Sequence, residues 1–161
     1  MKKKTYLATA FLLAYGTALA VDTPNMKEGL WKIHTVTTRP GAPPNETTSS
    51  LCRNHAYDEQ VTQMAENHPG CTVTHETTGD KRTFTSSCKV GPTTIQSSGT
   101  TTVSGDTSFR TEYSTTYSPP FMGKSQESSV QEQTYAGPCP AGMNPGDRML
   151  ADGTIQHLGP R

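Results

Sequence analysis

The chain has 161 residues, the length of about one domain, of which 31% are hydrophobic and 17% charged, with a formal net charge of zero. The missing basic excess argues against a nucleic-acid-binding protein, which needs cations for the phosphate backbone. Long runs of Val, Ile and Leu are also missing, which argues against a doubly wound nucleotide-binding fold. These averages mix two unlike parts, because residues 1–20 hold thirteen hydrophobic residues and three of the lysines.

The first twenty residues are a predicted export signal. Lysines 2–4 precede an apolar stretch at 5–18, and the small-x-small sequence at 18–20 predicts cleavage after Ala20. The apolar stretch is too short to cross a membrane comfortably, so we expect no membrane span after cleavage. We therefore expect a periplasmic or secreted protein with three parts: a signal peptide (1–20), a disulfide-linked β-rich domain (21–139) and a turn-rich, partly ordered C-terminal tail (140–161).

The mature chain opens with a predicted strand at 29–38, in which Trp31 and Ile33 share one face. A proline-rich loop leads to a returning strand at 47–52. The next segment, 54–67, is the predicted helix, with Asn54 as its N-cap and a Pro-Gly stop behind it. Apolar residues recur on it at helical spacing, and we expect this stripe to pack against the core: Tyr57, Val61, Met64 and Ala65.

Residues 71–78 and 81–90 are predicted to form a β-hairpin around a two-residue Gly-Asp turn. With Thr78 opposite Lys81, Cys71 falls directly opposite Cys88 in a close, non-hydrogen-bonded pair. His75 then shares a face with Phe84, whereas the other face is polar.

The four cysteines of the mature chain predict two disulfides, because their number is even and the expected compartment is oxidising. The hairpin favours Cys71–Cys88, which leaves Cys52 to pair with Cys139. The pairing of Cys52 with Cys71 and of Cys88 with Cys139 remains open. Cys52-x2-His55 and His68-x2-Cys71 also have the spacing of a zinc site, but export favours oxidised cysteines, and we predict no metal site.

A second hairpin is predicted at 93–104 and 107–117 around Gly105-Asp106, with Gly99 as a candidate bulge. A two-residue turn would place Val103 and Phe109 on opposite faces, so the turn has three residues or a bulge corrects the phase. A loop at 118–123 and a strand at 127–136 follow, and the tail has one further short hairpin around residues 152–153. The prediction is a mainly β fold, an antiparallel meander, curved sheet or small open barrel with one wet face and one short helix.

Several of these motifs, in this order, resemble an exported bacterial family known as domain of unknown function 3617. They are the sequence Met26-Lys27-Glu28-Gly29-Leu30-Trp31, the Pro-Gly at 40–41, Cys52 before the helix, the Cys71–Cys88 hairpin and the Gly-Pro-Cys-Pro-Ala-Gly-Met run at 137–143. The resemblance covers roughly residues 26–153 and implies a small secreted or periplasmic β-rich domain. It implies no activity and no catalytic residues.

Residues with a recognisable catalytic pattern are missing. The sequence has no Gly-x-Ser-x-Gly elbow and no Gly-rich phosphate loop. Five scattered histidines do not identify a base, although His75 beside Phe84 is the most interesting of them. We therefore predict no catalytic residue and no cofactor, and we favour a protein that is not an enzyme over the hydrolase considered below.

Five aromatic residues are candidates either for the core or for a ligand-facing surface: Trp31, Phe84, Phe109, Tyr113 and Tyr117. The first hypothesis for function is a non-enzymatic domain whose curved sheet binds a small apolar or envelope-derived ligand. The alternative is a structural or protein-interaction module of the cell envelope, which uses its polar strands. A hydrolase with an unrecognised site is the third.

Overall fold

The computed structural model describes residues 25–158; the predicted export signal lies outside them. Within this range the chain forms one antiparallel sheet in the order β3-β4-β5-β6-β7-β1-β2-β8-β9 and one helix. The elements are β1 (Gly29–Thr38), β2 (Asn45–Arg53), α1 (His55–Glu66), β3 (Cys71–Thr78), β4 (Lys81–Val90), β5 (Thr93–Ser104), β6 (Ser108–Phe121), β7 (Lys124–Gly137), β8 (Arg148–Leu150) and β9 (Ile155–Gln156). The predicted mainly β fold is confirmed.

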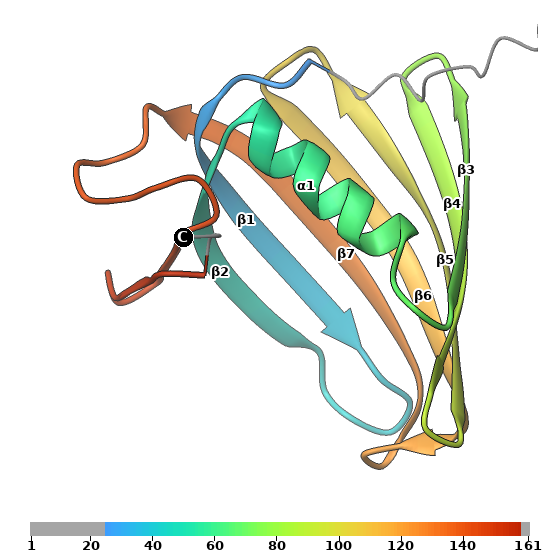
Figure 1. Ribbon diagram of the computed structural model, residues 1–161. Helices are drawn as coiled ribbons and strands as arrows, with labels where there is room; N and C mark the ends of the chain where they lie inside the picture. Colours follow the sequence, from blue (N-terminus) through green and yellow to red (C-terminus); the bar gives the residue numbers. More distant parts are fainter. Residues whose placement is uncertain (1–24, 159–161) are drawn as a thin grey trace, which may run out of the picture.

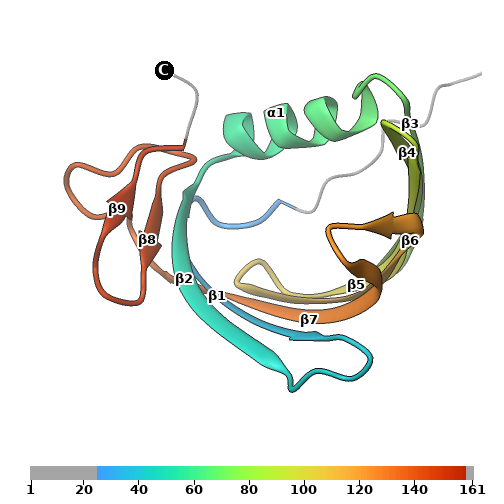
Figure 2. The same cartoon turned by 90° about the horizontal axis from the view of Figure 1, so that it is seen from below.

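The sheet is strongly curved, and the helix crosses its concave side (Figure 1). Seen along the strands, β2, β1, β7, β6, β5, β4 and β3 follow an open arc, and α1 extends from the β2 end toward the β3 end (Figure 2). The sheet does not close, because β3 and β9 are its outer strands. Of the three predicted architectures, the open curved sheet is the observed one.

The strand register decides which residues share the concave face, because directly opposite residues point to the same side of a sheet. One row across the sheet is Val103–Phe109–Gln133–Ile33. The next is Arg82–Thr101–Thr111–Gln131–Thr35. Hydroxyl and amide side chains thus lie beside aromatic ones on this face, which explains how so polar a sequence forms an ordered sheet.

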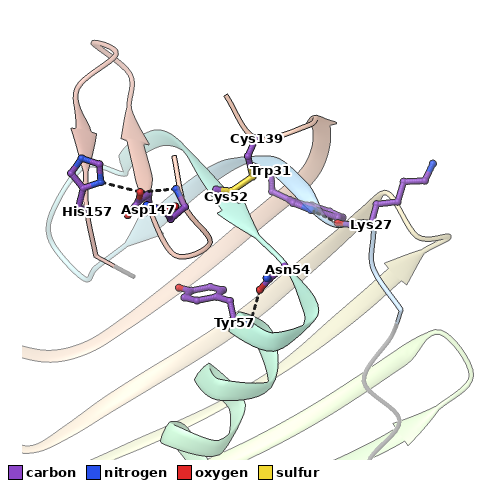
Figure 3. The surroundings of a disulfide bond; sticks show 9 residues. Lys27, Trp31, Cys52, Asn54, Tyr57, Cys139, Asp147 and His157 are labelled. Carbon is purple, nitrogen blue, oxygen red and sulfur yellow. Dashed lines mark hydrogen bonds and ion pairs between the residues drawn. A yellow bond between two sulfur atoms is a disulfide. The ribbon is translucent and has the colours of Figure 1, made fainter. Parts of the chain in front are cut away.

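Helix α1 begins where the sequence predicts. The Asn54 side chain accepts a hydrogen bond from the Tyr57 backbone N–H at 2.8 Å (Figure 3), the N-cap contact that satisfies a free donor of the first turn. The expectation that the apolar stripe packs into the core was wrong. No residue of α1 is buried, and the Met64 side chain keeps 65% of its exposure, because the helix bridges the open side of the arc instead of resting on the sheet.

Strands β3 and β4 pair in the predicted register, with Thr78 opposite Lys81 and Cys71 opposite Cys88. Both predicted disulfides are present, Cys71–Cys88 and Cys52–Cys139. The alternative pairing is excluded. Both cysteines of the zinc spacing, Cys52 and Cys71, are in disulfides in the structure.

The turn between β5 and β6 has three residues, since Ser104 pairs with Ser108 and Val103 with Phe109. Gly99 marks no bulge, and the register continues through it on both sides. It is needed for space: a Cβ atom there would lie 2.6 Å from the Tyr113 Cβ and 2.8 Å from the Phe84 ring. The missing side chain leaves room for the Phe84 ring and the Tyr113 Cβ atom on either side of β5.

The predicted loop at 118–123 is shorter in the structure. Strand β6 runs on to Phe121, which pairs with Lys124 of β7 across a two-residue turn. The register shifts between Thr116 and Phe121, so Pro119 and Pro120 fall in the irregular stretch between the two β7 ladder segments. A proline is tolerated there because no ladder donor is required of it.

The buried apolar side chains come from the first elements of the described chain and from the segment after β7. They are Met26, Trp31, Ile33, Cys52 and Met143. The residues after β7 fold back over Cys52, whose backbone N–H donates to the Asp147 carbonyl at 3.0 Å and whose carbonyl accepts from Gly146 at 2.8 Å. The predicted hairpin of the tail is β8–β9, and β8 adds to the sheet beside β2.

Candidate functional site

A cavity of about 290 Å³ lies between α1 and the concave face of the sheet. The helix contributes four side chains to its wall, and the rest come from the segment before β1 and from five strands. The lining residues are Met26, Leu51, Arg53, Tyr57, Asp58, Val61, Thr62, Arg82, Thr101, Val103, Phe109 and Gln133. Elements distant in sequence thus meet around one space.

Arg53, the last residue of β2, is held in place on four sides. Its guanidinium lies over two aromatic rings, 5.3 Å from the Trp31 centroid and 5.2 Å from that of Phe109. Its Nε donates to Asp58 at 2.9 Å, and its Nη1 donates to the Gln133 side chain at 3.0 Å. Stacking and hydrogen bonds together fix the direction of this cation.

The floor beneath Arg53 is a hydrogen-bonded chain of amides. Gln133 has only 8% of its surface exposed, and its Nε2 donates to the Gln131 side chain at 2.6 Å. Gln131 in turn donates to the Thr35 hydroxyl at 3.3 Å. Each amide accepts a hydrogen bond with its oxygen and donates one with its nitrogen. Arg53 therefore orients a hydrogen-bond network that crosses β2, β7 and β1.

Trp31 forms the rigid base of this corner. It is fully buried, and its ring centroid lies 5.6 Å from that of Phe109 and 6.0 Å from that of Tyr135. The indole N–H donates to the Lys27 carbonyl at 2.9 Å (Figure 3). All the usual requirements of a buried tryptophan are met, so its role is to support Arg53 and Phe109.

The five predicted aromatic residues all lie on the concave face, but the structure does not bring them together. Phe109 lines the cavity, and Trp31 lies directly beneath its wall. Phe84 and Tyr113 lie on either side of Gly99 in the next part of the face. Tyr117 is farther along β6, where its ring stacks on Phe121 with centroids 6.4 Å apart.

The Tyr117 hydroxyl is the centre of a separate polar cluster. It donates to Glu127 at 2.6 Å, and Glu127 also accepts from Arg39 at 3.0 Å. Burial, followed by this hydrogen bond, raises the pKa of Tyr117 to about 12. The same hydrogen bond is the main cause that lowers the pKa of Glu127, and Arg39 and Lys124 lower it further.

Sequence reasoning missed the charged and amide side chains of the cavity: Arg53, Asp58, Arg82 and Gln133. Strand alternation carried the signal for two of them. Arg53 is two residues from Leu51, which pairs with Trp31, so Arg53 lies on the Trp31 face; Arg82 is two residues from Phe84 and shares its face. The curvature that brings these strands toward one helix has no such signal.

The histidines do not share a site. His75 contacts Glu66 of α1 with Nε2 3.3 Å from Oε1, His34 faces Glu46, His55 faces Glu28, and His157 faces Asp147 (Figure 3). His68 lies at the turn before β3, with its Nδ1 3.0 Å from the Pro69 carbonyl oxygen. Among residues 25–158, no three metal-ligating side chains are grouped to hold an ion.

The described range also contains no helix with the length and apolar character that a membrane crossing needs.

The sequence profile described as "Protein of unknown function (DUF3617)" matches residues 26–139, and the chain belongs to this family. A comparison with curated proteins gives no match. Among solved structures, the chain is similar to a protein of unknown function from the DUF3598 family of Nostoc punctiforme, with 11% identity and a TM-score of 0.26. The similarity covers 71% of this chain and 50% of that one.

Proposed function

We propose that this protein is a non-enzymatic binding domain that holds a small molecule between α1 and the concave face of the sheet. The observation that carries the proposal is a twelve-residue helix without a buried residue, laid over a cavity of about 290 Å³. A helix of this length is marginal in water and normally depends on packing along one face. A ligand in the cavity would supply the packing that the sheet does not.

The two ends of α1 are attached to the rest of the protein by contacts that need no ligand. The first turn is held by the Asn54 cap and by Asp58, which pairs with Arg53 at 2.9 Å. The last turn is held by Glu66, 3.3 Å from His75 of β3. The helix therefore stays over the sheet while the space beneath its middle remains open to a ligand, as in other preformed pockets.

Native mass spectrometry of the unreduced protein tests the proposal. We expect a bound small molecule in the wild-type protein or, for protein stripped by mild denaturation, rebinding from an extract of the producing cells. Val61→Trp, which fills the cavity from the helix, should abolish this extra mass. Met64→Trp is the matched control, because Met64 lies on the same helix outside the cavity lining, and it should retain the ligand.

Two results would contradict binding at this place: no bound or rebound mass in the wild-type protein, or equal retention by Val61→Trp and Met64→Trp. Circular dichroism shows whether each variant is folded. If Val61→Trp does not fold, Thr62→Phe fills the same cavity from the next helical position and replaces it.

We further propose that the protein works outside the cytoplasm, in the periplasm or after secretion. The basic start, the short apolar stretch and the Ala18-Leu19-Ala20 sequence support this. Two disulfides in a small domain also suit an oxidising compartment. Cell fractionation of the full-length chain should give mature protein with Val21 at its N-terminus, whereas an uncleaved cytoplasmic protein would overturn this proposal.

A further inference from the structure

The cavity under α1 has an unequal charge lining. Two arginines, Arg53 from β2 and Arg82 from β4, reach it from opposite arms of the curved sheet. The acidic side chain in the lining is Asp58, and its carboxylate is bound by Arg53 Nε at 2.9 Å. Two guanidinium groups and one carboxylate thus line a site that is partly shielded from water, where charge interactions are stronger than in solvent.

Arg53 also keeps hydrogen-bonding capacity. A guanidinium has five N–H donors, and the hydrogen bonds of Arg53 involve Nε and Nη1. Its Nη2 group has no hydrogen-bond partner among residues 25–158. The planar group is already fixed by the Trp31 and Phe109 rings, so binding an acceptor there costs little further ordering.

Arg82 adds a second cation from β4, on the arm of the sheet that lies away from β2. It makes contacts of its own within the protein, but five donors on one guanidinium leave capacity for a further acceptor. The apolar part of the wall comes from Met26, Leu51, Val61, Val103 and Phe109, and it lies beside the polar side chains of Thr62, Thr101 and Gln133. The cavity therefore combines a cationic part with an apolar one.

From this arrangement we infer that the ligand is a small amphipathic organic anion, with a carboxylate toward Arg53 and Arg82 and an apolar body against Phe109 and Val103. The inference rests on the proposed function and specifies its ligand class. Carboxylates suit arginine because two oxygens match two parallel N–H groups. The volume of about 290 Å³ is at the small end of ligand pockets, which span roughly 300–1,000 Å³, so a compact or medium-chain acid fits better than a large lipid.

Three probes of one shape but different charge test the inference: octanoate, octanol and octylammonium. The sole tryptophan, Trp31, contacts Arg53 and gives a fluorescence signal, and calorimetry provides a readout independent of it. We expect octanoate to bind at least about tenfold more tightly than octanol, and octylammonium to bind most weakly. Arg82→Gln should weaken octanoate about tenfold and leave octanol unchanged, whereas Arg82→Lys should keep part of the preference.

The matched control is Arg110→Gln. Arg110 is exposed on the convex face, where it pairs with Glu112 and Glu132, so its removal changes the net charge by the same amount without touching the cavity. It should leave all three affinities unchanged. If it weakens octanoate as much as Arg82→Gln does, the preference is a general charge effect and the inference is overturned.

The failures of the two proposals are distinguishable. Equal affinities of wild-type protein for octanoate and octanol would overturn the anion preference and leave the binding cavity in place. If none of the probes binds and native mass spectra show no ligand, the proposed function falls too. Because the comparison of octanoate with octanol uses the wild-type protein alone, the inference stays testable even if Arg82→Gln does not fold.

Discussion

The two disulfides lie at opposite ends of the sheet, in different surroundings. Cys52 is 1% exposed and joins β2 to the segment after β7, and the buried Met143 follows Cys139 in that segment. Cys71 and Cys88 join β3 to β4 in a hairpin without a single buried residue. A disulfide therefore does not by itself mark the core of this protein. Cys52–Cys139 involves a buried cysteine, whereas Cys71–Cys88 joins two strands that have no buried residue.

The difference also concerns the length of chain that each bond closes. Cys52–Cys139 spans 87 residues, and Cys71–Cys88 spans 17. Restricting the unfolded chain is the main effect of a disulfide in the entropic account, and it grows slowly with loop length. Removal of Cys52–Cys139 should therefore have two effects. The unfolded chain loses its larger entropic restraint, and the segment after β7 is no longer bonded to β2.

The largest effect should come from Cys52→Ala/Cys139→Ala. We expect the free energy of unfolding to fall by about 4–5 kcal/mol, since the bond closes a long loop and holds the chain that covers the core. Urea unfolding followed by Trp31 fluorescence under non-reducing conditions measures this loss. A fall smaller than that of the hairpin variant below would contradict the assignment of this bond to the core.

Removal of the second bond, in Cys71→Ala/Cys88→Ala, should cost about 3 kcal/mol. Because the hairpin contains no buried residue, the loss should also be local. Hydrogen exchange should increase in β3 and β4 and at the end of α1 that contacts β3, with the β1 and β7 amides unchanged. Uniform loss of protection across the sheet would show that the two ends are not independent.

A substitution between the two ends tests their connection. Gly99→Ala places a Cβ atom 2.6 Å from the Glu112 carbonyl oxygen and from the Tyr113 Cβ, so β5 and β6 must move apart. We expect a loss of about 2 kcal/mol, typical of overpacking, measured by urea unfolding. The neighbouring Ser98→Ala, whose side chain points to the convex face, is the control and should change stability little.

The smallest effect should be a change of pH dependence in Tyr117→Phe. The raised pKa of Tyr117, about 12 against 10.0 in a free side chain, means that its stabilising contribution is complete below pH 10 and is lost as pH rises toward 12. The lowered pKa of Glu127 means that its contribution is present above its usual pKa and is lost as the solution becomes more acidic. The variant should show weaker pH dependence in both windows.

Urea midpoints across the pH range, taken as the difference between wild type and Tyr117→Phe, isolate this cluster from other titrating groups. Tyr113→Phe is the matched control, because it removes a hydroxyl from the same strand face. If both variants give the same pH profile, the Tyr117–Glu127 hydrogen bond does not couple to folding.

Local rules predicted the local structure well. The Asn54 cap and the Cys71–Cys88 register follow from a single side chain or a two-residue turn, and both are confirmed. The β5–β6 turn stayed ambiguous because Ser104 and Ser108 differ too little from their neighbours to reveal its phase. Pro119 and Pro120 suggested a loop because proline cannot donate to a strand ladder. The sequence does not show that the β6–β7 ladder is interrupted at these residues and resumes at Phe121.

The cavity was beyond these rules for a different reason. Arg53 and Arg82 belong to strands that lie on either side of β5, β6, β7 and β1 in the sheet. Their approach to the same space depends on the curvature of all the strands between them and on the helix above. Alternation assigns each arginine to a face, but neither alternation nor propensity measures how far a sheet bends.

The position of β1 in the sheet has a consequence for the order of folding. β1 lies between β2 and β7, and its pairs with β7 join residues about a hundred positions apart, such as Thr35 with Gln131. During synthesis from the N-terminus, the edge of β1 that pairs with β7 stays exposed until most of the domain has been synthesised. Pairing between residues so distant in sequence slows folding. We therefore expect β1 to lack one of its two partner strands until β7 has been synthesised.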